Sequence, residues 1–142
     1  MKLVVAIDPG GAHVGWCEGL VYEDGTVYVD HLQEYDPAGA LTRAEEVFPK
    51  ADEVIIEAFR LYPDKAKMLV GSEMETSQLI GALRYLARRC GREPVMQPAS
   101  IKVPTESVMR HRGVRHLAVA RGLGGHVKDA ETHLYQYVYR NR

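Results

Sequence analysis

Two short apolar runs in this chain each end in a carboxylate, and this pattern constrains the fold more than any other feature. Residues 3–7 are continuously apolar and lead into Asp8, and residues 54–56 lead into Glu57. Continuous apolar runs of this length are typical of buried central strands. A carboxylate at the end of a buried strand is unfavourable unless a cation meets it, and a hard divalent metal is a common partner. The two runs therefore predict a metal site at the edge of a sheet.

A third carboxylate stands in the last amphipathic segment of the chain. Asp129 lies in its expected first turn, with His126 three residues earlier, and this helical spacing places both side chains on one face. If the strands that end at Asp8 and Glu57 are neighbours, about 4.8 Å apart, all three carboxylates reach one point. Two Mg²⁺ or Mn²⁺ ions about 3.5–4 Å apart at that point would activate a water and stabilise the leaving oxygen of a phosphodiester. A neutral His126 can ligate a metal or assist proton transfer.

Each of these four residues also has a purely structural interpretation. Asp8 precedes Pro9-Gly10 and can be a turn former, Glu57 can be an exposed strand end, and Asp129 can pair with a helix dipole. His126 taken alone is typical of a surface histidine at the start of a helix. The functional interpretation rests on all three carboxylates standing at the end or start of a buried element, and for His126 it rests on the neighbouring Asp129 and on the resemblance described below. Three carboxylates without metal repel one another, so we expect a poorly ordered site in the metal-free protein.

The first half of the chain predicts an antiparallel meander followed by a crossover. The expected elements are strands at 3–8, 13–20 and 27–32, a helix at 38–48 and a fourth strand at 53–57. Asp24-Gly25 is a hairpin signal between the second and third strands. A helical crossover normally returns a strand parallel to its neighbour, so we expect the fourth strand to run parallel to the first.

The second half predicts helices around one more strand. The expected elements are a loop at 59–71, a helix at 72–89, a fifth strand at 94–97, a helix from 98 to about 109, and a last helix at 128–139. Ser72 is expected to cap the long helix, with Glu75 in capping-box spacing. The stretch 110–128 is rich in Arg, His and Gly, and we expect it to be the most mobile part. The 142 residues thus predict one α/β domain, with a mixed five-stranded sheet (antiparallel strands 1–3, parallel strands 4 and 5) flanked by helices.

Composition points to an ordinary globular chain with a charge asymmetry. No stretch approaches the roughly 20 apolar residues of a membrane span, and no secretory signal is recognisable. Cys17 and Cys90 form no CxxC pair, which favours reduced core thiols in a cytoplasmic protein. Residues 1–57 hold three Lys and Arg against twelve Asp and Glu, whereas residues 58–142 hold fifteen against seven. This asymmetry predicts either a polyanion-binding face beside an acidic pocket or a solvated surface with segregated charges, and both stay open.

The cationic and aromatic residues of the second half are candidates for nucleic-acid contact. Cationic side chains neutralise backbone phosphates, and an aromatic ring such as that of Tyr62 can stack on an unpaired base or, equally, anchor its own loop. The candidates are Arg60, Tyr62, Lys65, Lys67, Lys102, Arg110, Arg112, Arg115, Arg121 and Lys128.

Three ordered motifs resemble those of the RuvC-like nucleases of the RNase H-like superfamily. They are the segments 5–10 with 14–16, then 55–59, and then 126–130, and the segment 98–102 resembles the one that follows the fifth strand of that family. The resemblance spans nearly the whole chain and implies an RNase H-like fold. It also implies that Asp8, Glu57 and Asp129 are catalytic acids that bind metal with His126, and that Lys102 is a catalytic basic residue near the cleaved phosphate.

The family resemblance further implies an endonuclease that cuts branched DNA, with Holliday junctions as the leading substrate. Mg²⁺ or Mn²⁺ would be the cofactor, and a homodimer would present two equivalent sites. The segment 59–63 and the helix around 78–89 look most like bacteriophage-encoded members, which would act in the cytoplasm of a bacterial host. The helix at 76–90 and the closing helix are the two interface candidates.

Three other functions are compatible with parts of this pattern. The same scaffold supports an RNA-processing or RNA–DNA hybrid nuclease. A non-catalytic nucleic-acid-binding module with purely structural acids would also carry the basic residues. An actin-like sugar kinase also begins with a strand, an Asp and a Gly, but that fold needs two such domains, and 142 residues are too few.

Overall fold

The two apolar runs form the central strands of a five-stranded sheet with the order β3-β2-β1-β4-β5. The computed structural model describes residues 1–58 and 66–140, with side chains for 1–58 and 75–140. β1 (Lys2–Pro9), β2 (Val14–Val21) and β3 (Val27–Tyr35) form the antiparallel meander, while β4 (Glu53–Ala58) is parallel to β1 and β5 (Val95–Pro98) is parallel to β4. This sheet confirms the predicted fold class and the predicted direction of the fourth strand.

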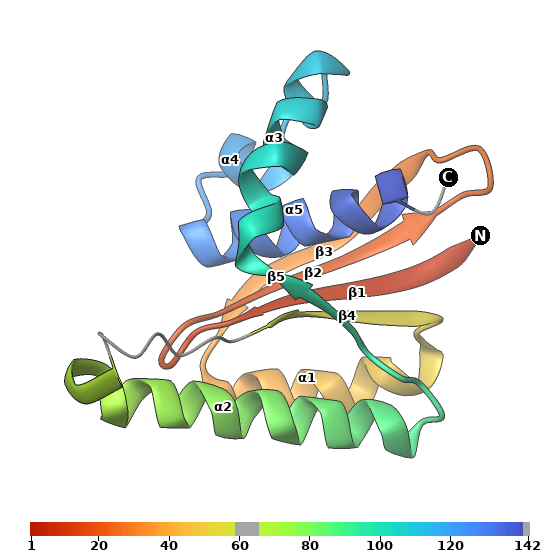
Figure 1. Ribbon diagram of the computed structural model, residues 1–142. Helices are drawn as coiled ribbons and strands as arrows, with labels where there is room; N and C mark the ends of the chain where they lie inside the picture. Colours follow the sequence, from red (N-terminus) through yellow and green to blue (C-terminus); the bar gives the residue numbers. More distant parts are fainter. Residues whose placement is uncertain (59–65, 141–142) are drawn as a thin grey trace.

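Helices cover both faces of the sheet. The helical elements are α1 (Pro37–Val47), the 3₁₀ turn η1 (Phe48–Lys50), α2 (Ala66–Arg89), the 3₁₀ turn η2 (Ala99–Ile101), α3 (Lys102–His111), α4 (Leu117–Ala120) and α5 (Gly125–Arg140). Helices α1 and α2 lie on one side of the sheet, and α5 lies on the other side with α3 and α4 beside it (Figure 1). In the described part of the chain, no helix combines the length and apolarity needed to cross a bilayer.

The alternation of side chains along β1 divides the interior into two cores. Val5 and Ile7 pack under α1 and α2, whereas Val4 and Ala6 pack under α5. Successive residues of a strand point to opposite faces, so this division is what the strand geometry requires. Asp8 follows the same alternation and therefore belongs to the α5 side of the sheet.

The long helix α2 begins earlier than its sequence predicts. It starts at Ala66, so Ser72 lies inside the helix, and the prediction that Ser72 caps it is wrong. Residues 66–70 are mostly strong helix formers, and their propensity extends the helix past the capping-box signal. In α1 the side chain of Asp36 acts as the cap, because its Oδ1 accepts a hydrogen bond from the Gly39 amide at 2.7 Å.

The stretch 110–128 contains more regular structure than its composition predicts. It includes the end of α3, the short helix α4 and the first residues of α5. The carboxylate of Glu131, which is fully buried, accepts hydrogen bonds from the amides of Leu117 and Ala118, both at 2.9 Å. These bonds satisfy the free amides at the start of α4 and fasten the stretch to α5.

Both predicted interface helices turn their apolar stripes inward. Leu83 and Ala87 of α2 and Leu134 and Val138 of α5 are buried in the two cores. These four residues are therefore used for folding, whereas Tyr135 and Tyr139 on α5 remain partly exposed.

Candidate active site at the ends of β1 and β4

Asp8 and Glu57 project from adjacent parallel strands onto the same face of the sheet. The pairing of β1 with β4 runs in register up to Ile7 and Ile56, so the two carboxylates are the next residues along each strand. Asp8 is almost fully buried, with 5% of its surface exposed, and Glu57 is only partly exposed. The sequence pattern that identified these residues thus places two carboxylates side by side in a region that is poorly hydrated.

Helix α5 carries three further polar side chains over these strand ends. His126, Asp129 and His133 lie at positions i, i+3 and i+7, which share one helix face. The start of α5 sits close against β2, because a side-chain carbon at Gly15 would collide with the backbone carbonyl of His126. Asp129 belongs to the second turn of α5 and not to the first, since the helix begins at Gly125, so its predicted place in the first turn is wrong.

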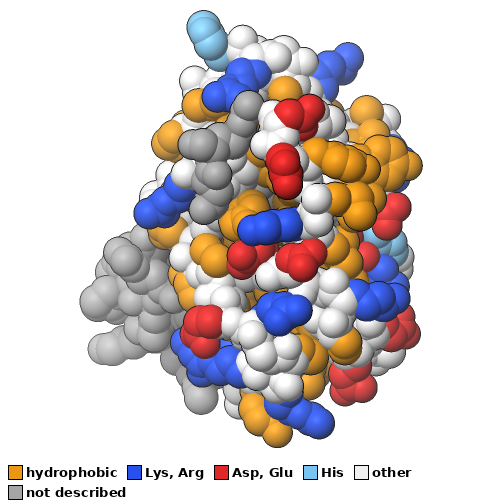
Figure 2. Space-filling view, turned by 90° about the vertical axis from the view of Figure 1, so that its right-hand side faces the viewer, with side chains coloured by type: hydrophobic (Ala, Val, Ile, Leu, Met, Phe, Trp, Pro, Cys, Tyr) orange, Lys and Arg blue, Asp and Glu red, His pale blue; other side chains and the backbone are white. Residues whose placement is uncertain are grey.

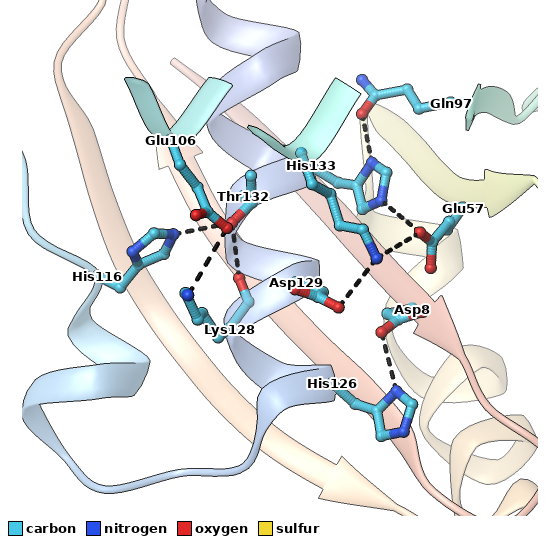
Figure 3. A network of polar contacts seen from close by, with 11 residues as sticks. Asp8, Glu57, Gln97, Glu106, His116, His126, Lys128, Asp129, Thr132 and His133 are labelled. Carbon is cyan, nitrogen blue, oxygen red and sulfur yellow. Dashed lines mark hydrogen bonds and ion pairs between the residues drawn. The ribbon is translucent and has the colours of Figure 1, made fainter. Parts of the chain in front are cut away.

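The predicted site residues meet in one network (Figure 3). His126 Nδ1 lies 2.9 Å from Asp8 Oδ2. Lys102, from the first turn of α3, places its Nζ 2.9 Å from Glu57 Oε1 and 3.0 Å from Asp129 Oδ2. The structure therefore brings together Asp8, Glu57, Lys102, His126 and Asp129 from four separate elements.

Sequence reasoning missed two residues of this network, His133 and Gln97. His133 is fully buried, its Nδ1 lies 2.7 Å from Gln97 Oε1, and its Nε2 lies 3.5 Å from Glu57 Oε1. Gln97, at 4% exposure, fixes one ring nitrogen, so the other nitrogen faces Glu57. The available signal was the position of His133, four residues after Asp129 and thus on the same helix face.

The network has more negative charge than its cation balances. Burial, followed by a hydrogen bond and repulsion from Glu57 and then by Asp129, raises the pKa of Asp8 to about 9. Burial also acts to raise the pKa of Glu57, but contacts with His133, Asp8 and Lys102 outweigh it and hold that pKa below its usual range. Asp8 and Glu57 therefore share one proton near neutral pH, as two adjacent buried carboxylates do when no further cation is present.

The lysine at the centre of the network does not satisfy every carboxylate oxygen. Burial acts to lower the pKa of Lys102, but its contacts with Glu57 and Asp129 raise it overall, so the ammonium stays charged. Glu57 Oε1 has this ion pair, yet among the described residues it has no partner with hydrogen-bond geometry, and the same holds for His133 Nε2. The charge on Glu57 Oε1 is therefore balanced by the Lys102 ammonium, without the directed hydrogen bonds that a buried carboxylate normally has.

The side chains fit a divalent cation in donor type and in charge. Carboxylate oxygens are the preferred ligands of Mg²⁺ and Mn²⁺, and the proton shared by Asp8 and Glu57 marks where positive charge is needed. Within residues 1–58 and 75–140, no three Asp, Glu, His or Cys side chains are arranged around a common ion position. Lys102 lies between Glu57 and Asp129, where its ammonium supplies the positive charge that a metal would otherwise supply.

The predicted nucleic-acid-binding residues separate into several places. Arg110, Arg115 and Lys128 line one groove beside α4. Arg112 instead lies over the ring of Tyr139, with its guanidinium carbon 4.5 Å from the ring centre. The other candidates lie elsewhere: Lys102 in the acidic network, Arg121 exposed at the end of α4, and Arg60, Tyr62, Lys65 and the side chain of Lys67 outside the described residues.

Charges on the face at which β1 begins and α5 ends are mixed in sign. Figure 2 shows acidic and basic side chains interspersed there, with hydrophobic atoms between them. This face lies at the opposite end of β1 from Asp8 (Figure 1). A surface that attracts a polyanion carries predominantly one sign of charge, so this face does not have that character.

The fold has close counterparts among solved structures, although no family model and no curated protein matches the sequence. RuvC of Thermus thermophilus in complex with a Holliday junction substrate has a TM-score of 0.71 and 18% identity, covering 99% of this chain and 95% of that one. The fowlpox virus resolvase, solved with Holliday junction DNA, has a TM-score of 0.63 and 8% identity over 98% of both chains. The yeast mitochondrial Holliday junction resolvase Ydc2 has a TM-score of 0.59 and 12% identity, covering 95% of this chain and 77% of that one.

These likenesses establish the fold of the chain. It has the RNase H-like arrangement of RuvC and related resolvases over nearly its whole length. The fold that the sequence motifs implied is thereby confirmed. At identities of 8–18%, the activity of this chain has to be argued from its own side chains.

Proposed function

We propose that this chain is a metal-dependent endonuclease of the RuvC type that hydrolyses phosphodiester bonds in Holliday junctions and other branched DNA. One observation carries the proposal: Asp8, Glu57 and Asp129 meet in a single network at the edge of a RuvC-like sheet. Such a cluster destabilises a fold unless it serves a cation or a reaction. Structures of the same fold with Holliday junction DNA supply the substrate class.

The proposed cofactor is Mg²⁺ or Mn²⁺, with two ions in each site. Asp8, Glu57 and Asp129 would hold it together with His126, and it would supply activation of water and neutralisation of the phosphate charge. His126 is placed to hold or accept a proton beside Asp8, since its Nδ1 lies 2.9 Å from that carboxylate. Lys102 would direct its ammonium towards the cleaved phosphate.

DNA binding would come from the cationic residues around this site. We assign phosphate contacts to Lys102, Arg110, Arg112, Arg115, Arg121 and Lys128, and further contacts to Arg60, Tyr62, Lys65 and Lys67. A two-fold dimer would present two sites to the two strands of a junction. We further propose that residues 1–142 act as one nuclease domain, that the protein is bacteriophage-encoded, and that it works in the host cytoplasm.

A nuclease assay on a panel of substrates tests the proposal. Wild type and Asp129→Asn would be compared on four-way, three-way, flap and linear DNA and on an RNA–DNA hybrid, with Mg²⁺, Mn²⁺ or chelator. We expect metal-dependent cleavage of the four-way junction by wild type alone. Preferential cleavage of the hybrid would assign the chain to the RNA–DNA hybrid nucleases. Binding without cleavage, unchanged in Asp8→Asn, would identify a non-catalytic module.

A further inference from the structure

A basic groove separate from the acidic network lies between α3, α4 and the start of α5. Its polar lining is Arg110, Arg115, His116, Lys128 and the single acid Glu106, and its apolar lining is Met109, Val114 and Val119. The groove holds about 240 Å³, which is below the roughly 300–1,000 Å³ of pockets that enclose a drug-sized molecule. It suits a phosphate with part of its sugar better than a whole small-molecule cofactor.

The wall of this groove is fastened to the helix that carries Asp129. His116 Nε2 lies 2.8 Å from Thr132 Oγ1, and that hydroxyl donates to the carbonyl of Lys128 at 3.0 Å. Burial lowers the pKa of His116, so the imidazole is neutral near pH 7 and acts as part of the wall. The groove and the acidic network therefore lie beside each other along α5, as Figure 3 shows for His116, Thr132 and Asp129.

Glu106 acts as an internal counter-ion for one of the three cations. Lys128 Nζ lies 3.7 Å from Glu106 Oε1, which is longer than the 2.9 and 3.0 Å ion pairs of Lys102. Both side chains are partly exposed, so their attraction is weakened by solvent. A backbone phosphate in the groove, with one negative charge shared by its two non-bridging oxygens, would compete well for Lys128, because Arg110 and Arg115 would contact it at the same time.

We propose that this groove binds one backbone phosphate of the DNA substrate, away from the phosphate that is cleaved. Arg110, Arg115 and Lys128 are its cationic contacts, and Glu106 competes with the phosphate for Lys128. The inference rests on the proposed function and deepens it, because a second anchored phosphate on α5 would fix the direction in which the strand passes Asp129. Val114 and Val119 would face the adjoining deoxyribose.

The test measures junction binding separately from cleavage. A fluorescent four-way junction is titrated in chelator with wild type, Arg110→Ala, Arg115→Ala, Arg115→Lys and Glu106→Gln, at several salt concentrations. Arg89→Ala is the matched control, because Arg89 is an exposed arginine at the far end of α2, over the ring of Tyr85. Thermal unfolding of every variant verifies that it is folded.

We expect Arg110→Ala and Arg115→Ala each to weaken binding about 5- to 20-fold and to lower the salt slope by about one. Arg115→Lys should recover most of the affinity, Glu106→Gln should tighten binding about threefold through loss of the competing charge, and Arg89→Ala should match wild type. Arg112→Ala, titrated in the same way, should lose less affinity than Arg115→Ala, because the Arg112 side chain lies over the ring of Tyr139.

Three outcomes would overturn the assignment of the groove to a DNA phosphate while leaving the proposed function intact. The first is that Arg110→Ala and Arg115→Ala bind and cleave the junction like Arg89→Ala. The second is that Glu106→Gln weakens binding. The third comes from calorimetry with inorganic phosphate: a tight phosphate site whose occupancy leaves junction affinity unchanged would assign the groove to a free anion. Failure of wild type to bind or cut any branched DNA would instead contradict the proposed function itself.

Discussion

Two buried carboxylate sites lie on opposite faces of the sheet, and they differ in how completely their charges are paired. Glu18, at 2% exposure, accepts hydrogen bonds from Trp16 Nε1 and from two nitrogens of Arg43, all at 2.7 Å. Asp8, at 5% exposure, instead shares a proton with Glu57 and has a pKa raised to about 9. Glu18 is thus paired with an arginine of its own. Glu57 and Asp129 instead share one lysine, and Asp8 lies against His126.

Under the proposed function, this difference separates a structural carboxylate, Glu18, from a catalytic one, Asp8. The hydrogen bonds from Arg43 to Glu18 hold α1 against β2. A buried charge that is fully paired in this way needs no ligand. A buried charge that is incompletely paired lowers the stability of the fold and is retained where it binds or reacts with something else. The two sites can therefore be told apart by substitutions that have opposite effects on stability and on activity.

The largest expected effect is the loss of cleavage in Asp8→Asn. The amide keeps the shape but removes a charge that would hold the cofactor, so cleavage should fall by at least about 10³-fold, the upper end of what one charge-stabilising group contributes. Because the amide stays neutral beside Glu57 without having to bind a proton, metal-free stability should stay constant or rise by about 0.5–2 kcal/mol. Single-turnover cleavage and urea unfolding measure the two quantities. A marked loss of stability would put Asp8 in the same class as Glu18.

The second expected effect is a loss of stability in Glu18→Gln without a loss of activity. Breaking this pair leaves Arg43 without its partner, which should lower the free energy of unfolding by about 3 kcal/mol. Cleavage per folded molecule should stay within twofold of wild type, because Glu18 lies on the face opposite to Asp8. The comparison fails if Glu18→Gln folds normally and yet loses cleavage.

The third expected effect concerns His133, whose Nε2 lies 3.5 Å from Glu57 Oε1. Loss of a residue that orients a metal ligand typically lowers activity about 10- to 100-fold, and we expect this range for His133→Asn. Its amide can replace Nδ1 towards Gln97 but cannot reach Glu57 in place of Nε2. His133→Gln can present a donor towards Glu57 and should therefore retain more cleavage at similar stability. Equal loss in the two variants would mean that His133 only fills space.

The fourth expected effect is a pH dependence of metal-free stability. The pKa of Asp8 is about 9 in the folded protein against 3.8 when unfolded, so the folded state binds the extra proton between these values. Stability should therefore fall as pH rises from about 4 to about 9, by at most about 1.4 kcal/mol per pH unit. Glu57 acts in the opposite sense, because its lowered pKa contributes stability above 4.5 that is lost as pH falls.

Unfolding by urea in chelator at pH 5 to 9 measures this dependence. Asp8→Asn should remove the fall in stability above pH 5, and Glu18→Gln should keep it. Added Mg²⁺ should reduce the fall, because a bound cation takes the place of the proton. Parallel pH profiles for wild type and Asp8→Asn would show that Asp8 ionises normally in the folded protein.

The sequence determined the sheet well because strands and acids carry local signals. The runs that precede Asp8 and Glu57 were apolar without interruption, and alternation then fixed the face to which each carboxylate points. His126 and Asp129 are recognisable from their helical spacing together with the resemblance of residues 126–130 to the closing motif of the RuvC-like nucleases. These signals require only neighbours along the chain, so no knowledge of tertiary contacts was needed.

The remaining features depend on contacts between distant residues. Lys102 was expected near a phosphate, but its contacts with Glu57 and Asp129 follow from how α3 packs beside α5. Helix α4 is only four residues long and depends on Glu131, which lies 13 and 14 residues away. The early start of α2 shows a local helix propensity prevailing over a capping motif.

The most direct test of the central claim is cleavage of a synthetic four-way junction and its matching linear duplex by wild-type protein, with Mg²⁺ or with chelator. If the carboxylates of residues 8, 57 and 129 hold a cofactor that cuts branched DNA, the junction alone will be nicked, and only when metal is present. Cleavage that persists in chelator, or an intact junction at saturating protein and metal, would contradict the account.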